Sequence, residues 1–436
     1  MSKKNAAGIQ IEILDARQTS VRAGLGLAII GALIFGWFAV RWQLGNMLAD
    51  LTAPNDANAK NIADLAVNLA PNDPTTRWLA AASQKSVFTT EAIEATARSF
   101  ETVVQKSPND YRWWVELGRA REQAEKMDAA ETAFQRAVAL APNYTYPHWQ
   151  AGNFYLRQNR SREAFAELKK TAEFNSVYRE QVFSTAWDYY QKDTARLEEI
   201  AGGDPAVRAS LAKFYAAKQR PADSLRIWKM LPEADKQANS EIAKIIAQAF
   251  YEKKFYRQSL AFVRELGIAP DLRGETVQNA GFEKPIGEAE DNYFGWTILP
   301  LEKIEVKLDP TQKHEGSRSL RVAFSGYSEP QLFQVYQLVT VESAAKYRLT
   351  FWMKTDSLKS GGTPRLEIDN ANDDKSIVTS EPFPNGTNDW QPIKLEFTAP
   401  ENAEAVNLHL TRAFCGAQCP IFGTIWLDDF RLERLK

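Results

Sequence analysis

The 436-residue sequence predicts a multidomain protein with a single transmembrane helix, then an all-α solenoid of helical repeats, then an all-β jelly-roll sandwich. Three observations predict this fold class. They are an uncharged apolar run near the N-terminus, a helical pattern that recurs about every 34 residues, and short alternating segments in the last third of the chain. We place the cytoplasmic N-terminus at residues 1–22, the transmembrane helix at 23–42, the repeats at 52–268 and the sandwich at 272–436.

Within residues 23–42, the run AGLGLAIIGALIFGWFAV carries no charge, and Arg22 and Arg41 flank it. At about 1.5 Å of rise per residue, this run just spans the hydrocarbon core of a bilayer. Trp37 and Trp42 lie where an interfacial aromatic belt is expected. A cleaved signal peptide is the main alternative, although its apolar core would be shorter and would end in small residues. A buried globular helix is a third interpretation, but such a helix normally keeps a polar face.

The orientation of the helix follows from the basic residues on its two sides. Four of them precede the apolar run and two follow it closely: Lys3, Lys4, Arg17 and Arg22, then Arg41 and Lys60. The positive-inside rule therefore leaves the short N-terminus in the cytoplasm and the rest of the chain outside. In a bacterium this means a single-pass protein of the inner (cytoplasmic) membrane whose bulk is periplasmic.

Composition excludes some partners. Lys plus Arg number 53 against 55 Asp plus Glu, so the formal charge of −2 gives no drive toward nucleic acid.

The chain has two Cys, Cys415 and Cys419, in the loop AFCGAQCPIFG. In an oxidising compartment a local disulfide is the favoured interpretation, and it would stabilise the fold by roughly 2 kcal/mol. A zinc site would need two further ligands that this loop does not supply.

The helical repeat is clearest from Trp114. The chain there reads W-x2-L-G and continues with Ala130, Phe134, Ala137 and Pro142. These residues resemble the tetratricopeptide repeat, and weaker helix pairs continue to about Gly267. The resemblance implies a stacked array that binds a protein partner. Residues at repeat-defining positions are expected to pack in the core, whereas a groove contact is the alternative for four tryptophans off the pattern: Trp113, Trp149, Trp187 and Trp228.

Short alternating segments such as SLRVAF, YRLTFWMK and VNLHLT begin after about Asp271 and predict a two-sheet β-sandwich. The segment NAGFE at 279–283, the loop HEGSRSL at 314–320 and the closing WLDDFRL at 426–432 resemble the jelly-roll carbohydrate-binding modules, which are galactose-binding-like sandwiches. Trp296, Trp390 and Trp426 lie at motif positions, and we expect them in the core.

The resemblance implies a structural Ca²⁺ held by hard oxygen ligands. Carried over to this chain, the ligands are Glu283, backbone carbonyls around His314 to Ser317, and Asp428 or Asp429. The alternative is a salt bridge or backbone capping without a metal. Asp428 in particular is expected to need a partner, since an unpaired buried carboxylate is costly.

A glycan site needs aromatic rings beside side chains that bind hydroxyl groups. Strand alternation turns Arg348 and Trp352 outward on one segment and His409 outward on another, and Tyr336 or Gln334 is expected to join them. We expect these four residues to form a ligand site on one sheet face. The alternative is that Trp352 packs on a neighbouring loop or on the helical array.

No G-x-S-x-G, H-E-x-x-H or phosphate-loop motif occurs in the sequence, and no catalytic domain with paired carboxylates accompanies the sandwich. The acid-rich stretch 369–374 is expected to be a solvated turn. We therefore expect no enzyme. The sequence favours a membrane-anchored scaffold for envelope polysaccharide or exopolysaccharide assembly or export, whose repeats bind protein and whose sandwich binds glycan. The alternative is a generic envelope assembly protein whose sandwich binds protein or is purely structural.

Overall fold

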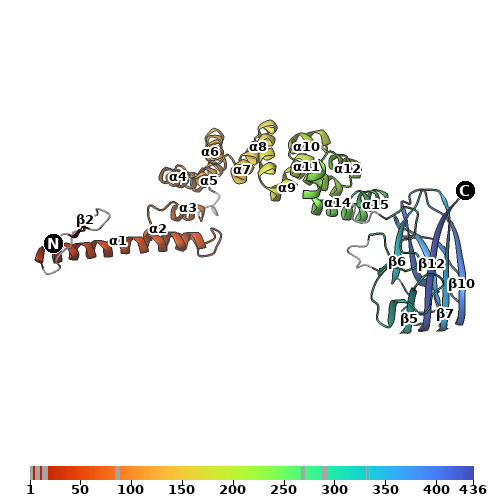
Figure 1. Ribbon diagram of the computed structural model, residues 1–436. Helices are drawn as coiled ribbons and strands as arrows, with labels where there is room; N and C mark the ends of the chain where they lie inside the picture. The colour runs from red at the N-terminus through yellow and green to blue at the C-terminus, as the bar shows by residue number, and fades with distance from the viewer. Residues whose placement is uncertain are drawn as a thin grey trace. The chain divides into compact units, whose positions relative to one another are not determined.

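A computed structural model describes residues 18–83, 89–266, 271–286, 293–329, 331–332 and 334–436, together with the backbone of two short paired strands, β1 (Lys3–Lys4) and β2 (Gln10–Ile11) (Figure 1). Most of the predicted cytoplasmic segment 1–22 lies outside the described residues, as does the predicted end of the repeats near Gly267. The chain divides into two compact units, Met1–Gly202 and Gly203–Lys436, and each is described by itself.

The first unit begins with the long helix α1 (Thr19–Leu51), which contains the predicted segment 23–42. Its apolar side chains are exposed, with 75 % of Phe35 accessible, and the helix is long and apolar enough to cross a membrane. The helix continues to Leu51 because its last turns pack on the next helices. A Cβ on Gly45 would lie 2.8 Å from that of Ala70, so only glycine permits this approach.

Helix pairs follow α1 through both units. In the first unit they are α2 (Ala59–Leu69), α3 (Pro74–Ala82), α4 (Thr90–Lys106), α5 (Tyr111–Gln123), α6 (Met127–Leu140), α7 (Thr145–Arg157), α8 (Ser161–Phe174), α9 (Ser176–Tyr189) and α10 (Thr194–Ala201). In the second unit they are α11 (Pro205–Ala217), α12 (Pro221–Lys229), α13 (Glu233–Ala238), α14 (Ser240–Glu252) and α15 (Tyr256–Glu265). This arrangement is the predicted all-α, tetratricopeptide-like solenoid.

The repeat-defining residues explain why these helices pair. Phe134 is fully buried, and a Cβ on Gly118 of the preceding helix would lie 3.0 Å from its ring. One repeat later, a Cβ on Gly152 would lie 2.8 Å from Leu168. A small residue opposite a large one therefore sets the close contact of each pair. Asp side chains such as that of Asp204 accept hydrogen bonds from the first backbone N–H groups of their helices.

The tryptophans off the repeat pattern do not line a groove as a group. Trp113, Trp187 and Trp228 are buried, so the groove interpretation is wrong for these three. Trp113 packs in an apolar cluster with Phe100, and Trp228 packs edge-on against Phe262, with ring centroids 5.6 Å apart. Trp149 is half-buried and packs against Tyr178, with ring centroids 5.2 Å apart.

The sandwich consists of two antiparallel five-stranded sheets in the described part of the chain. One sheet has the order β10-β7-β12-β5-β4, with β4 (Ile304–Asp309), β5 (Ser319–Tyr327), β7 (Lys346–Lys359), β10 (Gly386–Thr398) and β12 (Ile421–Leu435). The other has the order β3-β6-β11-β8-β9, with β3 (Thr297–Ile298), β6 (Val335–Thr340), β8 (Pro364–Asn370), β9 (Lys375–Thr379) and β11 (Ala405–Arg412). The predicted all-β sandwich is confirmed.

The inner faces of the two sheets share one apolar core. Phe351 of β7 and Leu408 of β11 are fully buried in it, and Trp296 packs there against Phe430. The core position predicted for Trp390 is wrong: this side chain is half-buried and lies outside that cluster. Trp426 is buried, and its indole N–H donates to Asp309 over 2.9 Å.

The last helix pair packs directly on the sandwich within the second unit. The Tyr256 hydroxyl donates to the Ala371 carbonyl over 3.1 Å, and the Lys254 ammonium lies 3.1 Å from the Asp374 carboxylate. Leu260 joins an apolar cluster with Phe294 of the sandwich. The last helix pair and the sandwich therefore belong to one compact unit.

This interface makes a prediction about stability. Tyr256→Phe removes the hydrogen bond to Ala371 and leaves a buried carbonyl without its donor, so we expect a loss of about 1 kcal/mol in the free energy of unfolding. Tyr144→Phe is the matched control, since Tyr144 is 60 % exposed. Denaturant unfolding of the full chain measures both. Equal stability of the two variants would mean that the contact contributes nothing.

Candidate functional site

The four residues predicted as one ligand site lie on two different sheets. Arg348 and Trp352 are on β7, whereas Tyr336 is on β6 and His409 is on β11. The inner faces of the sheets pack together, so outward side chains of β7 and β11 point away from each other. The expectation of one shared face is therefore wrong. Alternation identifies which side chains point outward but not which sheet a strand joins.

The first group of residues, the Trp352 face, consists of Trp352, His314, Trp390, Asp429 and Arg348. The His314 imidazole stacks on the Trp352 ring, with centroids 3.8 Å apart and planes 16° from parallel. Nδ1 of His314 lies 2.6 Å from the Asp429 carboxylate, and Trp390 approaches the imidazole edge-on. Arg348 is paired with Glu396 over 2.6 Å. One side of Trp352 is thus covered by protein and is no open platform for a sugar ring.

A hollow of about 360 Å³ adjoins the Trp352 ring. Its lining includes Thr350, Trp352 and Asp429 from two neighbouring strands. The carboxylates of Glu315 and Asp429 and a ring nitrogen of His314 lie within 4.8 Å of one another at its edge. The shape and lining therefore admit a small polar ligand or a cation beside the stacked rings.

The residues expected to hold Ca²⁺ come together around Gly281. A Cβ placed there would lie 3.5 Å from Asp429 Oδ1, 3.7 Å from Asp428 Oδ1 and 3.8 Å from Glu283 Cγ. A register shift in β12 after Asp428, with a positive φ of 49° at Asp429, turns both aspartates toward this point. Carboxylate oxygens are the donors that Ca²⁺ prefers. In the described part of the chain, however, the group whose ligand atoms all lie within 4.8 Å of one another is His314, Glu315 and Asp429, and the Glu283 carboxylate turns to Ser317 instead.

Backbone groups also satisfy these carboxylates. Glu283 accepts hydrogen bonds from the Ser317 backbone N–H over 2.8 Å and from the Ser317 hydroxyl. Asp428 accepts from the backbone N–H groups of His314 and Asp429, over 2.9 and 2.8 Å. Burial of Asp428 raises the pKa of its carboxyl to about 6, and the neighbouring Asp429 charge acts in the same direction. Backbone capping, the alternative to a metal, is thus present at Glu283 and Asp428.

The second group, the His409 face, consists of Tyr336, Arg365, Glu367, Asp369 and His409. Tyr336 and Glu367 flank His409 as its cross-strand partners on β6 and β8. The His409 Nε2 lies 3.1 Å from the Asp369 carboxylate and 4.0 Å from that of Glu367. The two carboxylate side chains remain 13 % and 19 % exposed, so a ligand can reach them.

Some polar atoms of the His409 face have unused hydrogen-bonding capacity. Among the described residues, three buried side-chain atoms here have no hydrogen-bond partner: Arg365 Nε, Asp369 Oδ1 and, beside β6, Gln334 Oε1. Burial raises the pKa of the Tyr251 hydroxyl in α14, and the Tyr251 ring packs against Tyr256 and Phe294. Unused donors and acceptors next to aromatic rings suit a ligand rich in hydroxyl groups.

Two functional side chains of this face were missed at the sequence level. Asp369 belongs to β8 and pairs with His409, so its assignment to a solvated turn is wrong, although Asp373 and Asp374 are exposed as expected. Arg365 is the second of these side chains. The signal was present in the alternation of RLEID, which places Arg365, Glu367 and Asp369 on one side of the strand.

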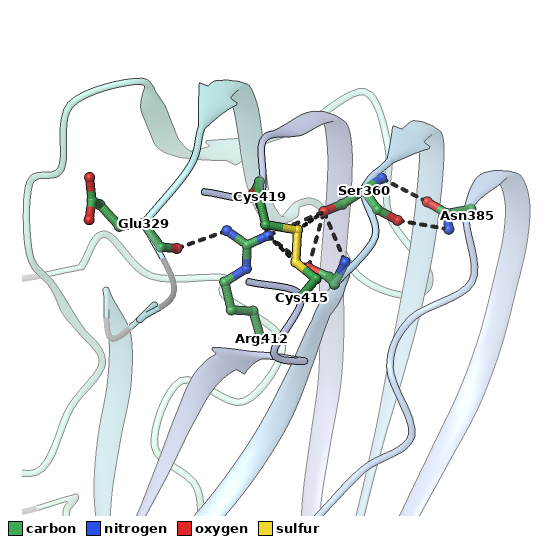
Figure 2. The surroundings of a disulfide bond; sticks show 7 residues. Glu329, Ser360, Asn385, Arg412, Cys415 and Cys419 are labelled. Carbon is green, nitrogen blue, oxygen red and sulfur yellow. Dashed lines mark hydrogen bonds between the residues drawn. A yellow bond between two sulfur atoms is a disulfide. The ribbon is translucent and has the colours of Figure 1, made fainter. Parts of the chain in front are cut away.

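The Arg412 side chain lies beside the disulfide and donates hydrogen bonds that support the cysteine loop (Figure 2). Cys415 and Cys419 form a disulfide with their Cα atoms 5.9 Å apart. The buried Arg412 guanidinium donates to the carbonyls of Glu329, Gly362 and Cys419 over 2.8, 3.1 and 2.6 Å. Burial lowers its pKa, and the side chain remains a cation surrounded by carbonyl dipoles. This arrangement fixes the loop that follows β11.

Comparison with known proteins agrees with this fold. Residues 274–412 match the family model described as carbohydrate binding domain. A CBM4 structure is 16 % identical with a TM-score of 0.27, and the match covers 36 % of this chain and 99 % of that one. TmCBM61 in complex with β-1,4-galactotriose is 18 % identical with a TM-score of 0.25, covering 38 % and 100 %.

A further match is MamA 41-end from Desulfovibrio magneticus RS-1, which is 23 % identical with a TM-score of 0.26, covering 31 % of this chain and 73 % of that one. No curated protein matches the chain. The C-terminal region is a carbohydrate-binding-module-like domain that follows a tetratricopeptide-like array.

Proposed function

We propose that this chain is a membrane-anchored, non-enzymatic scaffold that binds glycan through its sandwich and a protein partner through its helical repeats. Helix α1 would anchor it in the inner membrane with the bulk of the chain in the periplasm, where it serves envelope polysaccharide or exopolysaccharide assembly or export. The exposed apolar surface of α1 supports the anchor, and the match of residues 274–412 to the carbohydrate binding domain supports the ligand class.

The observation that carries the glycan proposal is the polar floor of the His409 face. Sugars present many hydroxyl groups, each of which can donate and accept, and their ring faces stack on aromatic side chains. The Asp369 and Glu367 side chains are 13 % and 19 % exposed beside His409, so their carboxylates can accept from sugar hydroxyls. Tyr336 on the adjoining strand offers a ring. We therefore assign the glycan to this face, and Trp352 and Arg348 to the opposite one.

The test is glycan binding by the full chain in detergent micelles, on a glycan array and with cell-wall polysaccharides. Wild type should bind at least one polysaccharide, and Asp369→Ala should weaken that binding by about tenfold or more, because a buried ligand hydrogen bond to a charged group is worth about 1.5–3 kcal/mol. Asp389→Ala is the matched control, since Asp389 is exposed on the other sheet. Absence of binding by wild type would instead favour the generic assembly protein.

We further propose that Glu283, Asp428 and Asp429 hold a structural Ca²⁺, which would neutralise their charges and fix the loop at Ser317. Addition of Ca²⁺ to the EDTA-treated full chain should raise the melting temperature of the sandwich by roughly 5 °C at saturating ion. Glu283→Gln should abolish this increase, whereas Glu305→Gln, an exposed pair partner of Lys307, should retain it. A calcium effect that persists in Glu283→Gln would place the ion elsewhere.

A further inference from the structure

A cavity of about 570 Å³ lies in the first compact unit, outside the sandwich and its two faces. It is lined by residues of α8 and α10 and by Tyr190, which directly follows α9. Helices α7 and α8 form one pair and α9 and α10 the next, so the cavity opens between the second helices of two consecutive pairs. In a stacked array the first and second helices line opposite surfaces. The cavity therefore belongs to the surface opposite the one formed by α5, α7 and α9.

The floor of this cavity is apolar and aromatic. Phe165 and Ile200 line it and are 6 % and 5 % exposed. The half-buried Tyr190 ring packs on Phe165, with centroids 4.7 Å apart. An apolar floor at the surface of a repeat array costs free energy when it faces water, and an apolar side chain that fills it recovers that cost.

The rim of the cavity is cationic. Arg162, Lys169 and Arg196 contribute three positive charges to the lining, whereas Glu199 is its one acid. Glu199 is paired with Arg196 over 2.9 Å, and Lys169 donates to the Glu199 backbone carbonyl over 3.3 Å. Two positive charges of the lining are thus not neutralised within it. Nearby acids are Glu163, which pairs with Arg160, and Glu173, which lies outside the lining near Gly202.

We propose that this cavity binds an acidic peptide segment in which an aromatic or large apolar side chain is adjacent to carboxylates. The side chain fills the floor formed by Phe165, Tyr190 and Ile200, and the carboxylates pair with Arg162 and Lys169 at the rim. A neutral polysaccharide would leave the positive charges of Arg162 and Lys169 without a counter-charge, and the balanced charge of the whole chain gives nucleic acid no general attraction. The inference rests on the proposed role of the repeats as a protein-binding region.

The experiment uses the full chain in detergent micelles and a fluorescein-labelled peptide, Glu-Asp-Phe-Glu-Asp, with binding followed by fluorescence anisotropy. Charge reversal in Arg162→Glu and in Lys169→Glu should each raise the dissociation constant about tenfold or more. Arg136→Glu, which reverses an exposed arginine on α6, is the matched control and should stay within about twofold. A peptide with alanine in place of phenylalanine should bind about tenfold more weakly, since the floor is then empty.

Three outcomes would overturn the inference. They are no binding of the peptide by wild type, an equal loss in Arg136→Glu, or equal binding of the alanine peptide, which would indicate a general electrostatic attraction. Circular dichroism melting of each variant checks that the fold is retained.

A pull-down from envelope extract separates this result from the proposed function. If wild type captures a protein that both reversals still bind, the repeats bind protein elsewhere and this inference alone fails; if nothing is captured, the proposed role of the repeats fails too.

Discussion

Arg412→Met should be among the most destabilising single substitutions in the sandwich. The guanidinium is 3 % exposed and donates to three carbonyl groups, those of Glu329, Gly362 and Cys419. Methionine fills similar space but donates to none of them. The carbonyls of Gly362 and Cys419 are buried, and each costs about 1–3 kcal/mol without a partner, whereas the part-buried Glu329 carbonyl can turn to water. Some of that loss is offset because a buried cation no longer has to be desolvated.

We therefore expect a net loss of about 3 kcal/mol for Arg412→Met, which corresponds to a fall in melting temperature of roughly 6–12 °C for a unit of this size. Thermal unfolding of the full chain, followed by tryptophan fluorescence, measures it. Arg348→Met is the matched control: Arg348 is 40 % exposed and pairs with an exposed glutamate, so its loss should stay within about 0.5 kcal/mol. Equal effects of the two substitutions would contradict the structural role of Arg412.

The same argument couples Arg412 to the disulfide. Its guanidinium donates to the carbonyl of Cys419 and lies 3.5 Å from the sulfur of Cys415. The Arg412 hydrogen bonds and the disulfide therefore fix the same loop. Removal of the two cysteines in the Arg412→Met background should then cost less than in wild type, since the loop is already released. If the losses in the free energy of unfolding simply add in the combined variant, the Arg412 hydrogen bonds and the disulfide act separately.

The sequence was sufficient for the architecture because both periodicities are local. Phe134 faces Gly118 within a single helix pair, so the spacing of large and small residues along the chain reports the contact directly. Strand alternation likewise identified which residues of YRLTFWMK and VNLHLT point to the core, and Phe351 and Leu408 are buried there. Local patterns of this kind predict elements and their buried sides.

The site was harder to predict because it depends on pairing between distant segments. β7 pairs with β12, and β11 pairs with β6 and β8, and nothing in the alternation of a strand tells which partner it will choose. The stacking of His314 on Trp352 comes from the loop between β4 and β5, which has no periodicity. Arg412 is a different case. Continued alternation from Leu408 and Leu410 places it inward, and only the rarity of buried arginine argued otherwise.

Tyr336→Ala and Trp352→Ala should have opposite consequences for glycan binding. Tyr336 is half-buried on β6 as the cross-strand neighbour of His409, beside the unpaired Asp369 Oδ1 and Arg365 Nε. Loss of its ring removes the stacking surface of the His409 face, and aromatic stacking with its area burial is worth about 1.5–3 kcal/mol, so affinity should fall about 10- to 100-fold.

Trp352→Ala should leave the affinity within about threefold, because the imidazole of His314 already covers one side of its ring and it lies on the opposite sheet. It should instead lower the melting temperature, since His314 loses the ring on which it stacks. Isothermal titration of the full chain with the polysaccharide identified on the array, alongside thermal unfolding, separates affinity from stability. The reverse pattern, in which Trp352→Ala abolishes binding and Tyr336→Ala does not, would move the glycan to the hollow beside Asp429, because no single ligand of a few sugar units can contact both outer faces of the sandwich.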